Sequence, residues 1–65
     1  MYILHIVELR EKRGWSQREL GRRANLSGTC INKVENGTRK MTLETAVKVA
    51  KALEVSLDEL VEIEK

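Results

Sequence analysis

The 65-residue sequence contains no proline and no phenylalanine, and it has only one cysteine, one tryptophan and one tyrosine. Without proline, nothing in the chain interrupts a helix from within. Because aromatic residues are so scarce, the small core of such a short chain must be aliphatic. A single cysteine cannot form an intramolecular disulfide. Valine and isoleucine do not alternate with polar residues over any run, so we expect no strand.

The residues that carry enzyme chemistry are also scarce. The lone His5 and the lone Cys30 cannot supply the usual four ligands of a zinc site. No plausible Ser/His/Asp arrangement and no glycine-rich phosphate loop is present. Neighbouring carboxylates occur only near the acidic C-terminal end, where we interpret them as solvated. We therefore expect a non-enzymatic protein with no cofactor and no metal.

Long hydrophobic runs are missing as well. No apolar run approaches the roughly 18 residues that are needed to span a bilayer. The apolar start, MYILHIV, is too short and wrongly flanked for a secretory signal. We expect one cytoplasmic domain over residues 1–65, with no membrane partner.

Charge is unevenly distributed although the net charge is only +2. Residues 1–40 contain nine Lys/Arg against four Asp/Glu, whereas residues 41–65 contain three against six. A basic front half suggests a polyanionic partner on one side of the molecule. Ordinary surface charge would explain the same counts, so charge alone does not decide between the two.

The chain is organised around residues 16–37, which read as two short helices with a tight corner between them. Apolar or small residues recur there at helical spacing: Leu20, Gly21, Ala24, Leu26, Ile31 and Val34. Gly21 lets a second helix approach closely, and Asn25 tolerates a left-handed corner. Two amphipathic helices joined in this way predict a helix-turn-helix unit.

Three further helices are expected. The first runs over residues 3–13. The fourth runs over residues 43–53 behind Thr42, with one apolar stripe formed by Leu43, Ala46, Val47, Ala50 and Leu53. The fifth starts at Ser56 and ends near residue 61 or 62, and the tail to residue 65 either frays or extends it. Ser16 and Ser56 each begin a capping box, because Glu follows three residues later.

The outer face of the third helix (residues 28–36) carries polar side chains. If Ile31 and Val34 face inward, a turn of about 100° per residue places Thr29, Lys33 and Asn36 outward. Lys can donate to guanine, and the Thr methyl can contact a thymine methyl. On either side of this face, four residues are placed to meet phosphates: Gln17, Asn36, Arg39 and Lys40. Each alone would read as a solvated side chain, and their joint spacing favours DNA.

The chain resembles the Cro and phage-repressor type helix-turn-helix family, also called the xenobiotic response element family. The resemblance is carried by LREKRG at 9–14, WSQREL at 15–20, INKVENG at 31–37 and LETAVKVAKALEVSLDEL at 43–60. It implies an all-α, compact five-helix domain of the lambda-repressor type, in which helices two and three read DNA.

The resemblance also assigns roles to individual residues. It places base contacts at Gly28, Thr29 and Lys33, with Asn32 as a flanking contact. It places phosphate contacts at Gln17, Ser27, Asn36, Arg39 and Lys40. Three positions depart from the family pattern: Gly28 lacks a long polar side chain, Cys30 replaces a small polar residue, and Glu54 stands at an expected left-handed position where Gly is usual.

A structural ion pair between Arg10 and Glu35 is implied by the same resemblance. The residue pattern agrees, because each charge lies beside an apolar stripe and needs a partner. Such a pair would tie helix one to the end of helix three.

Taken together, the sequence predicts a sequence-specific regulator of transcription, a repressor, that binds double-stranded DNA as a homodimer. The apolar residues available for a dimer surface are Tyr2, Leu4 and Val7, or Val61 and Ile63, and the sequence does not choose between them. Two alternatives use the same fold. One is the antitoxin of a toxin–antitoxin pair, and the other is a coactivator-like module that binds a partner protein rather than a DNA sequence.

Overall fold

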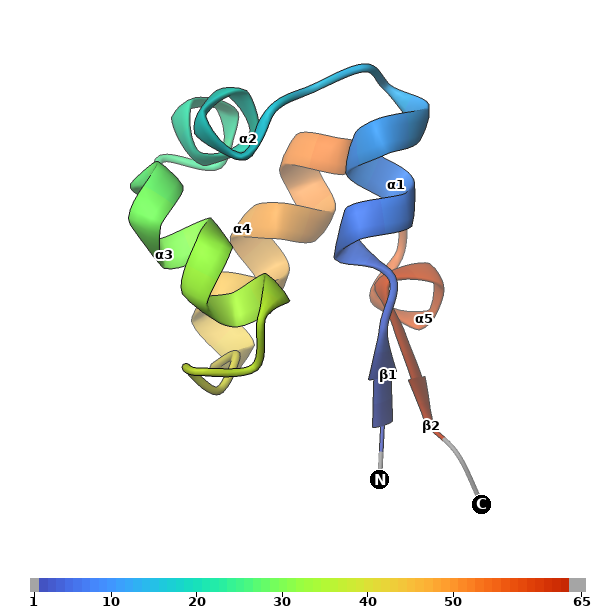
Figure 1. Cartoon of the computed structure of the whole chain (residues 1–65). Helices are drawn as coiled ribbons and strands as arrows, with labels where there is room; N and C mark the ends of the chain where they lie inside the picture. The colour runs from blue at the N-terminus through green and yellow to red at the C-terminus, as the bar shows by residue number, and fades with distance from the viewer. Residues whose placement is uncertain (1, 64–65) are drawn as a thin grey trace.

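Five helices and two short strands make up the described part of the chain, residues 2–63 of the computed structural model (Figure 1). In chain order they are β1 (Tyr2–Leu4), α1 (Ile6–Lys12), α2 (Gln17–Arg23), α3 (Gly28–Glu35), α4 (Leu43–Leu53), α5 (Leu57–Leu60) and β2 (Val61–Ile63). In Figure 1, α4 crosses the middle of the molecule, with α2 and α3 on one side and α1 on the other. The expected five helices are therefore present.

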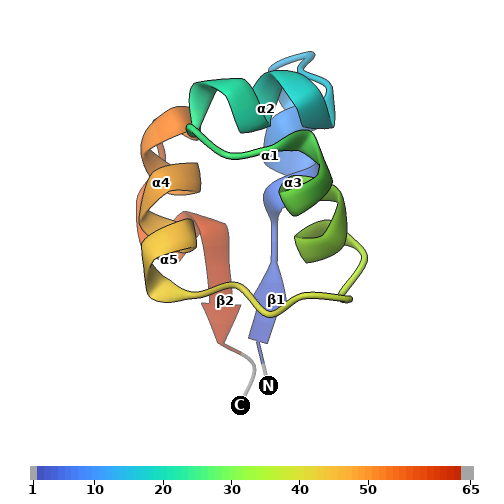
Figure 2. The same ribbon diagram turned by 90° about the vertical axis from the view of Figure 1, so that its left-hand side faces the viewer.

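The expectation that the chain forms no strand was wrong. β1 and β2 pair antiparallel, with Leu4 opposite Val61 and Tyr2 opposite Ile63, and the amide of His5 donates to the carbonyl of Leu60 at 2.9 Å. Helix one consequently starts at Ile6, and β2 takes the place of the expected helical tail. Three residues per strand are too few to show alternation, and the two strands come from opposite ends of the chain, which lie side by side in the fold (Figures 1 and 2). Residues 64–65 lie outside the described residues.

Side-chain caps fix where four of the helices begin. The hydroxyls of Ser16, Ser27, Thr42 and Ser56 each accept a hydrogen bond from the backbone amide three residues later. The capping box at Ser56 is complete, because the Glu59 carboxylate returns to the Ser56 amide at 3.1 Å. At Ser16 only half of the box forms, since Glu19 turns instead toward two arginines.

The core is aliphatic, as expected from the composition. Its buried members are Ile6, Leu20, Ala24, Ile31, Val34, Ala46, Val49, Ala50, Leu53 and Leu60. The stripe predicted on α4 was wrong in part. Val49 is fully buried, whereas Leu43 remains 73% exposed and Val47 36% exposed. The buried face is rotated toward Val49, and Leu43 in the first turn lies beyond the end of the core.

The corner between α2 and α3 depends on two residues that the sequence singles out. Asn25 has φ of 59°, in the left-handed region. A Cβ added to Gly21 would lie 2.7 Å from the carbonyl oxygen of Leu26. Gly21 is therefore needed for a close approach, although what approaches is the backbone of the turn rather than a helix.

A left-handed residue also ends α4, and it generates a stability prediction. Glu54 has φ of 57° and ψ of 42°, which costs a non-glycine residue about 1 kcal/mol. Its contact with Arg13, at 3.9 Å, is exposed and contributes little. We expect Glu54→Gly to raise the free energy of unfolding in urea by about 1 kcal/mol. Lys51→Gly, inside the same helix, should lower the free energy of unfolding by a similar amount. An equal loss of stability in both variants would contradict the left-handed strain at Glu54.

His5 ties α1 to β2, so stability should depend on pH. Its Nδ1 lies 3.0 Å from Glu8 Oε1 and its Nε2 lies 3.0 Å from Glu62 Oε1. These hydrogen bonds, first to Glu8 and then to Glu62, raise the pKa of His5 above its ordinary value of 6.5. The stabilisation is therefore complete below about pH 6.5 and is lost as the pH rises through the folded pKa.

The measurement is the melting temperature of the wild type and of His5→Gln across pH. The advantage of the wild type should be largest at about pH 5.5 and should shrink toward about pH 8.5. An advantage that grows as the pH rises would show that the charged form of His5 is not the favoured one.

Candidate nucleic-acid interface

The interface is built on the tight packing of α3 against α2. A Cβ added to Gly28 would lie 3.2 Å from the Cα of Arg18, so the first residue of α3 sits directly on the backbone of α2. The Ser27 hydroxyl accepts from the Cys30 amide at 3.0 Å and caps the helix. Cys30 itself is half-buried and packs against the core. Gly28 and Ser27 therefore position α3, whatever else they contact.

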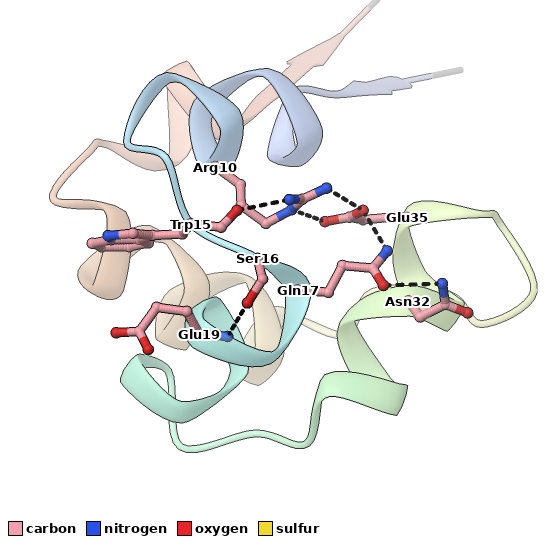
Figure 3. Close-up of polar contacts among 7 residues, drawn as sticks. All are labelled: Arg10, Trp15, Ser16, Gln17, Glu19, Asn32 and Glu35. Atoms are coloured by element: carbon pink, nitrogen blue, oxygen red, sulfur yellow. Dashed lines mark hydrogen bonds and ion pairs between the residues drawn. The ribbon is translucent and has the colours of Figure 1, made fainter.

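A buried ion pair holds the end of α3 to α1. Arg10 Nε donates to Glu35 Oε2 at 2.8 Å, and a second guanidinium nitrogen donates to Glu35 Oε1 at 3.2 Å (Figure 3). The side chains are only 12% and 6% exposed. Arg10 also donates to the backbone carbonyl of Trp15 at 2.8 Å. The hydrogen bond to Glu35 raises the pKa of the Arg10 guanidinium above its ordinary value. The pair expected between Arg10 and Glu35 is thus present, and it also fixes the segment that enters α2.

A row of carboxamides continues from Glu35 along α3. Gln17 Nε2 donates to Glu35 Oε1 at 2.9 Å, and Gln17 Oε1 accepts from Asn32 Nδ2 at 3.2 Å (Figure 3). Asn32 Oδ1 then accepts from Asn36 Nδ2 at 3.4 Å, and Asn36 Oδ1 accepts from the Thr38 amide at 2.9 Å. We call Gln17, Asn32 and Asn36 the amide row. It joins three of the predicted DNA contacts to the buried carboxylate.

The direction of the amide row follows from the charge of Glu35. An ionised carboxylate only accepts hydrogen bonds, so Gln17 must present its NH₂ group there and its oxygen to Asn32. The same logic orients Asn32 and then Asn36. Each NH₂ group carries two hydrogens, and its bond within the row uses one. The row is therefore a set of oriented donors held in place before any ligand arrives.

The two residues predicted to read bases lie on α3 beside this row. Thr29 is exposed and Lys33 is partly buried. The carbonyl of Lys33 accepts from the amides of Thr38 at 2.9 Å and Arg39 at 3.1 Å, which folds the basic loop back against the end of α3. Thr29, Asn32 and Asn36 are exposed, so none of residues 2–63 covers this side of α3.

The cations of α3 and of the loop after it differ in their pairing from Arg22 and Arg23 of α2. Within residues 2–63, Lys33, Arg39 and Lys40 make no salt bridge. On α2, in contrast, Glu19 binds both Arg22 and Arg23 at 2.6 Å, and these contacts lower its pKa to about 2. Arg18 of α2 is exposed and also makes no salt bridge among residues 2–63, so the positive charge free to attract a polyanion lies on α3, on the loop after it and at Arg18.

Other kinds of site find no support in the described residues. Among residues 2–63, no three His, Cys, Asp or Glu side chains gather in a way that could hold a metal ion. None of the helices described here has the length and apolar character required to cross a membrane.

Comparison with known families identifies the arrangement. The helix-turn-helix family model matches residues 6–60, from the start of α1 to the end of α5. The chain belongs to the Cro/C1-type helix-turn-helix family. This family consists of DNA-binding regulators that are not normally enzymes, and the chain is accordingly a DNA-binding transcriptional regulator. A search of curated proteins finds no match to it.

Sequence reasoning missed two features of this Cro/C1-type site. The carbonyl of Trp15 is a third partner for Arg10, and a backbone acceptor leaves no trace in residue type. The amide row was also missed as a unit, although the four-residue spacing of Asn32 and Asn36 was visible and places them on one helix face.

The buried ion pair generates a prediction about stability. Glu35→Ala removes the carboxylate that bonds Arg10 and accepts from Gln17, and breaking such a buried pair costs about 3 kcal/mol or more. Urea denaturation followed by circular dichroism measures the loss. The control is Glu11→Ala, at an exposed position of α1, where the change should stay within about 0.5 kcal/mol. Equal midpoints for Glu35→Ala and the wild type would contradict the structural role.

Proposed function

We propose that this regulator is a repressor that places α3 in the major groove of a specific DNA sequence and acts as a dimer. The observation that carries the proposal is the outer side of α3, where Thr29 is exposed and Lys33 makes no salt bridge among residues 2–63. An α-helix fits the major groove, where each base pair presents a distinct pattern of donors, acceptors and methyl groups.

The proposed contacts divide into two kinds. Thr29 and Lys33 approach base edges, with the backbone of Gly28 and the flank of Asn32 beside them. Lys33 donates to guanine O6 or N7, and the Thr29 methyl meets a thymine methyl. Contacts to phosphate position the domain and come from Gln17, Ser27, Asn36, Arg39 and Lys40.

The amide row supports the phosphate role of Gln17 and Asn36. Their NH₂ groups are oriented by bonds that lead back to a buried carboxylate, so little side-chain freedom is lost when DNA binds. Ser27 contributes through the start of α3, where backbone amides point out of the helix end.

A dimer is proposed because one recognition helix covers only a few base pairs. Two copies on successive major grooves place their recognition helices about 34 Å apart and read a near-palindrome. Occupying the duplex is by itself sufficient to exclude another protein from it, which favours repression as the regulatory role.

The test is selection from a pool of random duplexes, followed by titrations at several salt concentrations. We expect one enriched motif and a steep fall of affinity with salt. Recovery of no motif would contradict the proposed function and would favour the coactivator-like module that binds a partner protein.

Two variants distinguish the contacts that specify the DNA sequence from the contacts that position the domain on the duplex. Lys33→Ala should reduce the preference for the selected motif over a scrambled duplex by about tenfold, or about 1.4 kcal/mol, which lies within the range of about 1–3 kcal/mol for a lost base contact. Arg39→Ala should weaken both duplexes alike and reduce the salt slope by about one. Lys51→Ala, on the exposed side of α4, is the matched control and should change neither quantity. A Lys33→Ala protein with unchanged preference would exclude base reading by that residue.

A further inference from the structure

Arg18, in the first turn of α2, is a cation that its own helix does not neutralise. It is exposed, and among residues 2–63 it makes no salt bridge. A carboxylate three or four residues away would lie on the same helix face. The four positions at that spacing hold no acid; they are Gly14, Trp15, Gly21 and Arg22.

The local energetics disfavour a positive charge at this position. The first turn of a helix is the positive end of its dipole, so a cation there is unfavourable. Arg22 lies four residues further on, and like charges at that spacing repel each other. Glu19 does not relieve this repulsion, because it binds Arg22 and Arg23 instead. A residue that conflicts with its local surroundings is a candidate for a contact outside the domain.

The backbone of Arg18 lies against the first residue of α3. A Cβ added to Gly28 would lie 3.2 Å from the Cα of Arg18 and 3.6 Å from its Cβ. Gln17, the preceding residue, points from α2 toward α3 and bonds Asn32 (Figure 3). The side chain of Arg18 therefore starts beside the first turn of α3, next to the face that carries Thr29.

The same geometry limits what Gly28 can contribute to base reading. A side chain at Gly28 would be directed at the backbone of α2, so this residue presents only its own backbone to DNA. Thr29 is short, and Lys33 lies one helical turn further along. Base contacts concentrate at the start of a recognition helix. Arg18 is the long side chain that borders this part of α3.

We infer that Arg18 is a further specificity-determining residue, which reads a guanine in the major groove beside the first turn of α3. The inference rests on the proposed function, because it requires α3 to lie in that groove. A guanidinium group presents its donors in a planar fork, and this fork matches the O6 and N7 acceptors of guanine.

Arg18 is better suited to this contact than the other two arginines of α2. Arg22 and Arg23 each lie 2.6 Å from a carboxylate oxygen of Glu19, and either would have to give up that bond to bind DNA. Arg18 gives up no ion pair within the described residues. Its charge is thus available to a polyanion at no cost in internal pairing.

The order of residues along α3 predicts the order of the bases. Thr29 and Lys33 are four residues apart, which is a rise of about 6 Å. Stacked base pairs are about 3.4 Å apart, so these two residues read positions about two base pairs from each other. Arg18 lies on the Gly28 side of Thr29. The guanine that it reads should therefore lie on the opposite side of the Thr29 position from the base that Lys33 reads.

The test is selection from random duplexes with the wild type and with Arg18→Ala. The wild-type motif should contain a guanine whose replacement weakens binding by about tenfold. In Arg18→Ala this preference should disappear at that one position, while the preferences read by Thr29 and Lys33 remain. Arg18→Lys keeps the charge without the planar fork, so it should retain more of the overall affinity than Arg18→Ala and only part of the guanine preference.

Two controls separate base reading from loss of charge and from loss of structure. Arg22→Ala removes the same charge one turn further along α2 and should leave the preference at every position unchanged. The melting temperature of Arg18→Ala should be no lower than that of the wild type, because the variant places a strong helix former in the first turn and removes a cation from it. A purely structural role for Arg18 would lower it.

The outcomes separate this inference from the proposed function. An identical motif for the wild type and Arg18→Ala would overturn the inference and leave the proposed function standing. Equal weakening of the selected and the scrambled duplex by Arg18→Ala would assign the residue to a phosphate and would also overturn it. The same loss of guanine preference in Arg22→Ala would overturn it as well. Selection of no motif by the wild type would remove the proposed function itself, and base reading by Arg18 with it.

Discussion

The carboxylate of Glu35 is the interaction on which this structure most depends. It is almost fully removed from solvent, so the free energy of folding includes its desolvation, and only well-placed donors can offset that penalty. Arg10 supplies charge and two donors from α1, and Gln17 supplies a further donor from α2. Three helices therefore meet at one buried anion, and their relative placement is set by hydrogen-bond geometry as well as by aliphatic packing.

The same anion connects stability to recognition. Because a carboxylate can only accept, it orients Gln17, and the orientation passes through Asn32 to Asn36 on the outer side of α3. Side chains that would otherwise sample several rotamers are held in one. A buried polar group that stabilises the fold thus also prepares donors at the surface proposed to bind DNA, which is the preorganisation that a binding site needs.

Much of this was predictable from the sequence, for reasons that differ between elements. Ser27, Thr42 and Ser56 mark helix starts because capping is local chemistry, and Asn25 marks a helix end because few residues fit a left-handed position. The left-handed position of Glu54 was expected from the resemblance, because Glu as a residue type gives no such signal. The strands could not be predicted, since their partners are almost a whole chain apart. The rotation of the buried face of α4 toward Val49 also depends on what packs against it, and a pattern of apolar residues does not contain that information.

For the site, helical spacing and the resemblance could nominate Gln17, Asn32 and Asn36. The hydrogen bonds that join these three residues could not be predicted, because they form only where α2 and α3 cross.

The pairing of β1 with β2 has a consequence for the order of assembly. Residues 2 and 63 can meet only by closing a loop that contains nearly the whole chain, and the entropy lost in closing a loop grows with its length. Each strand contributes just three residues, which is too little to compensate for that loss before the helices have packed. The strand pair should therefore form last during folding and separate first during thermal fluctuation. Among residues 2–63, the strand pair is then the element that opens most readily, while the α2–α3 pair stays intact.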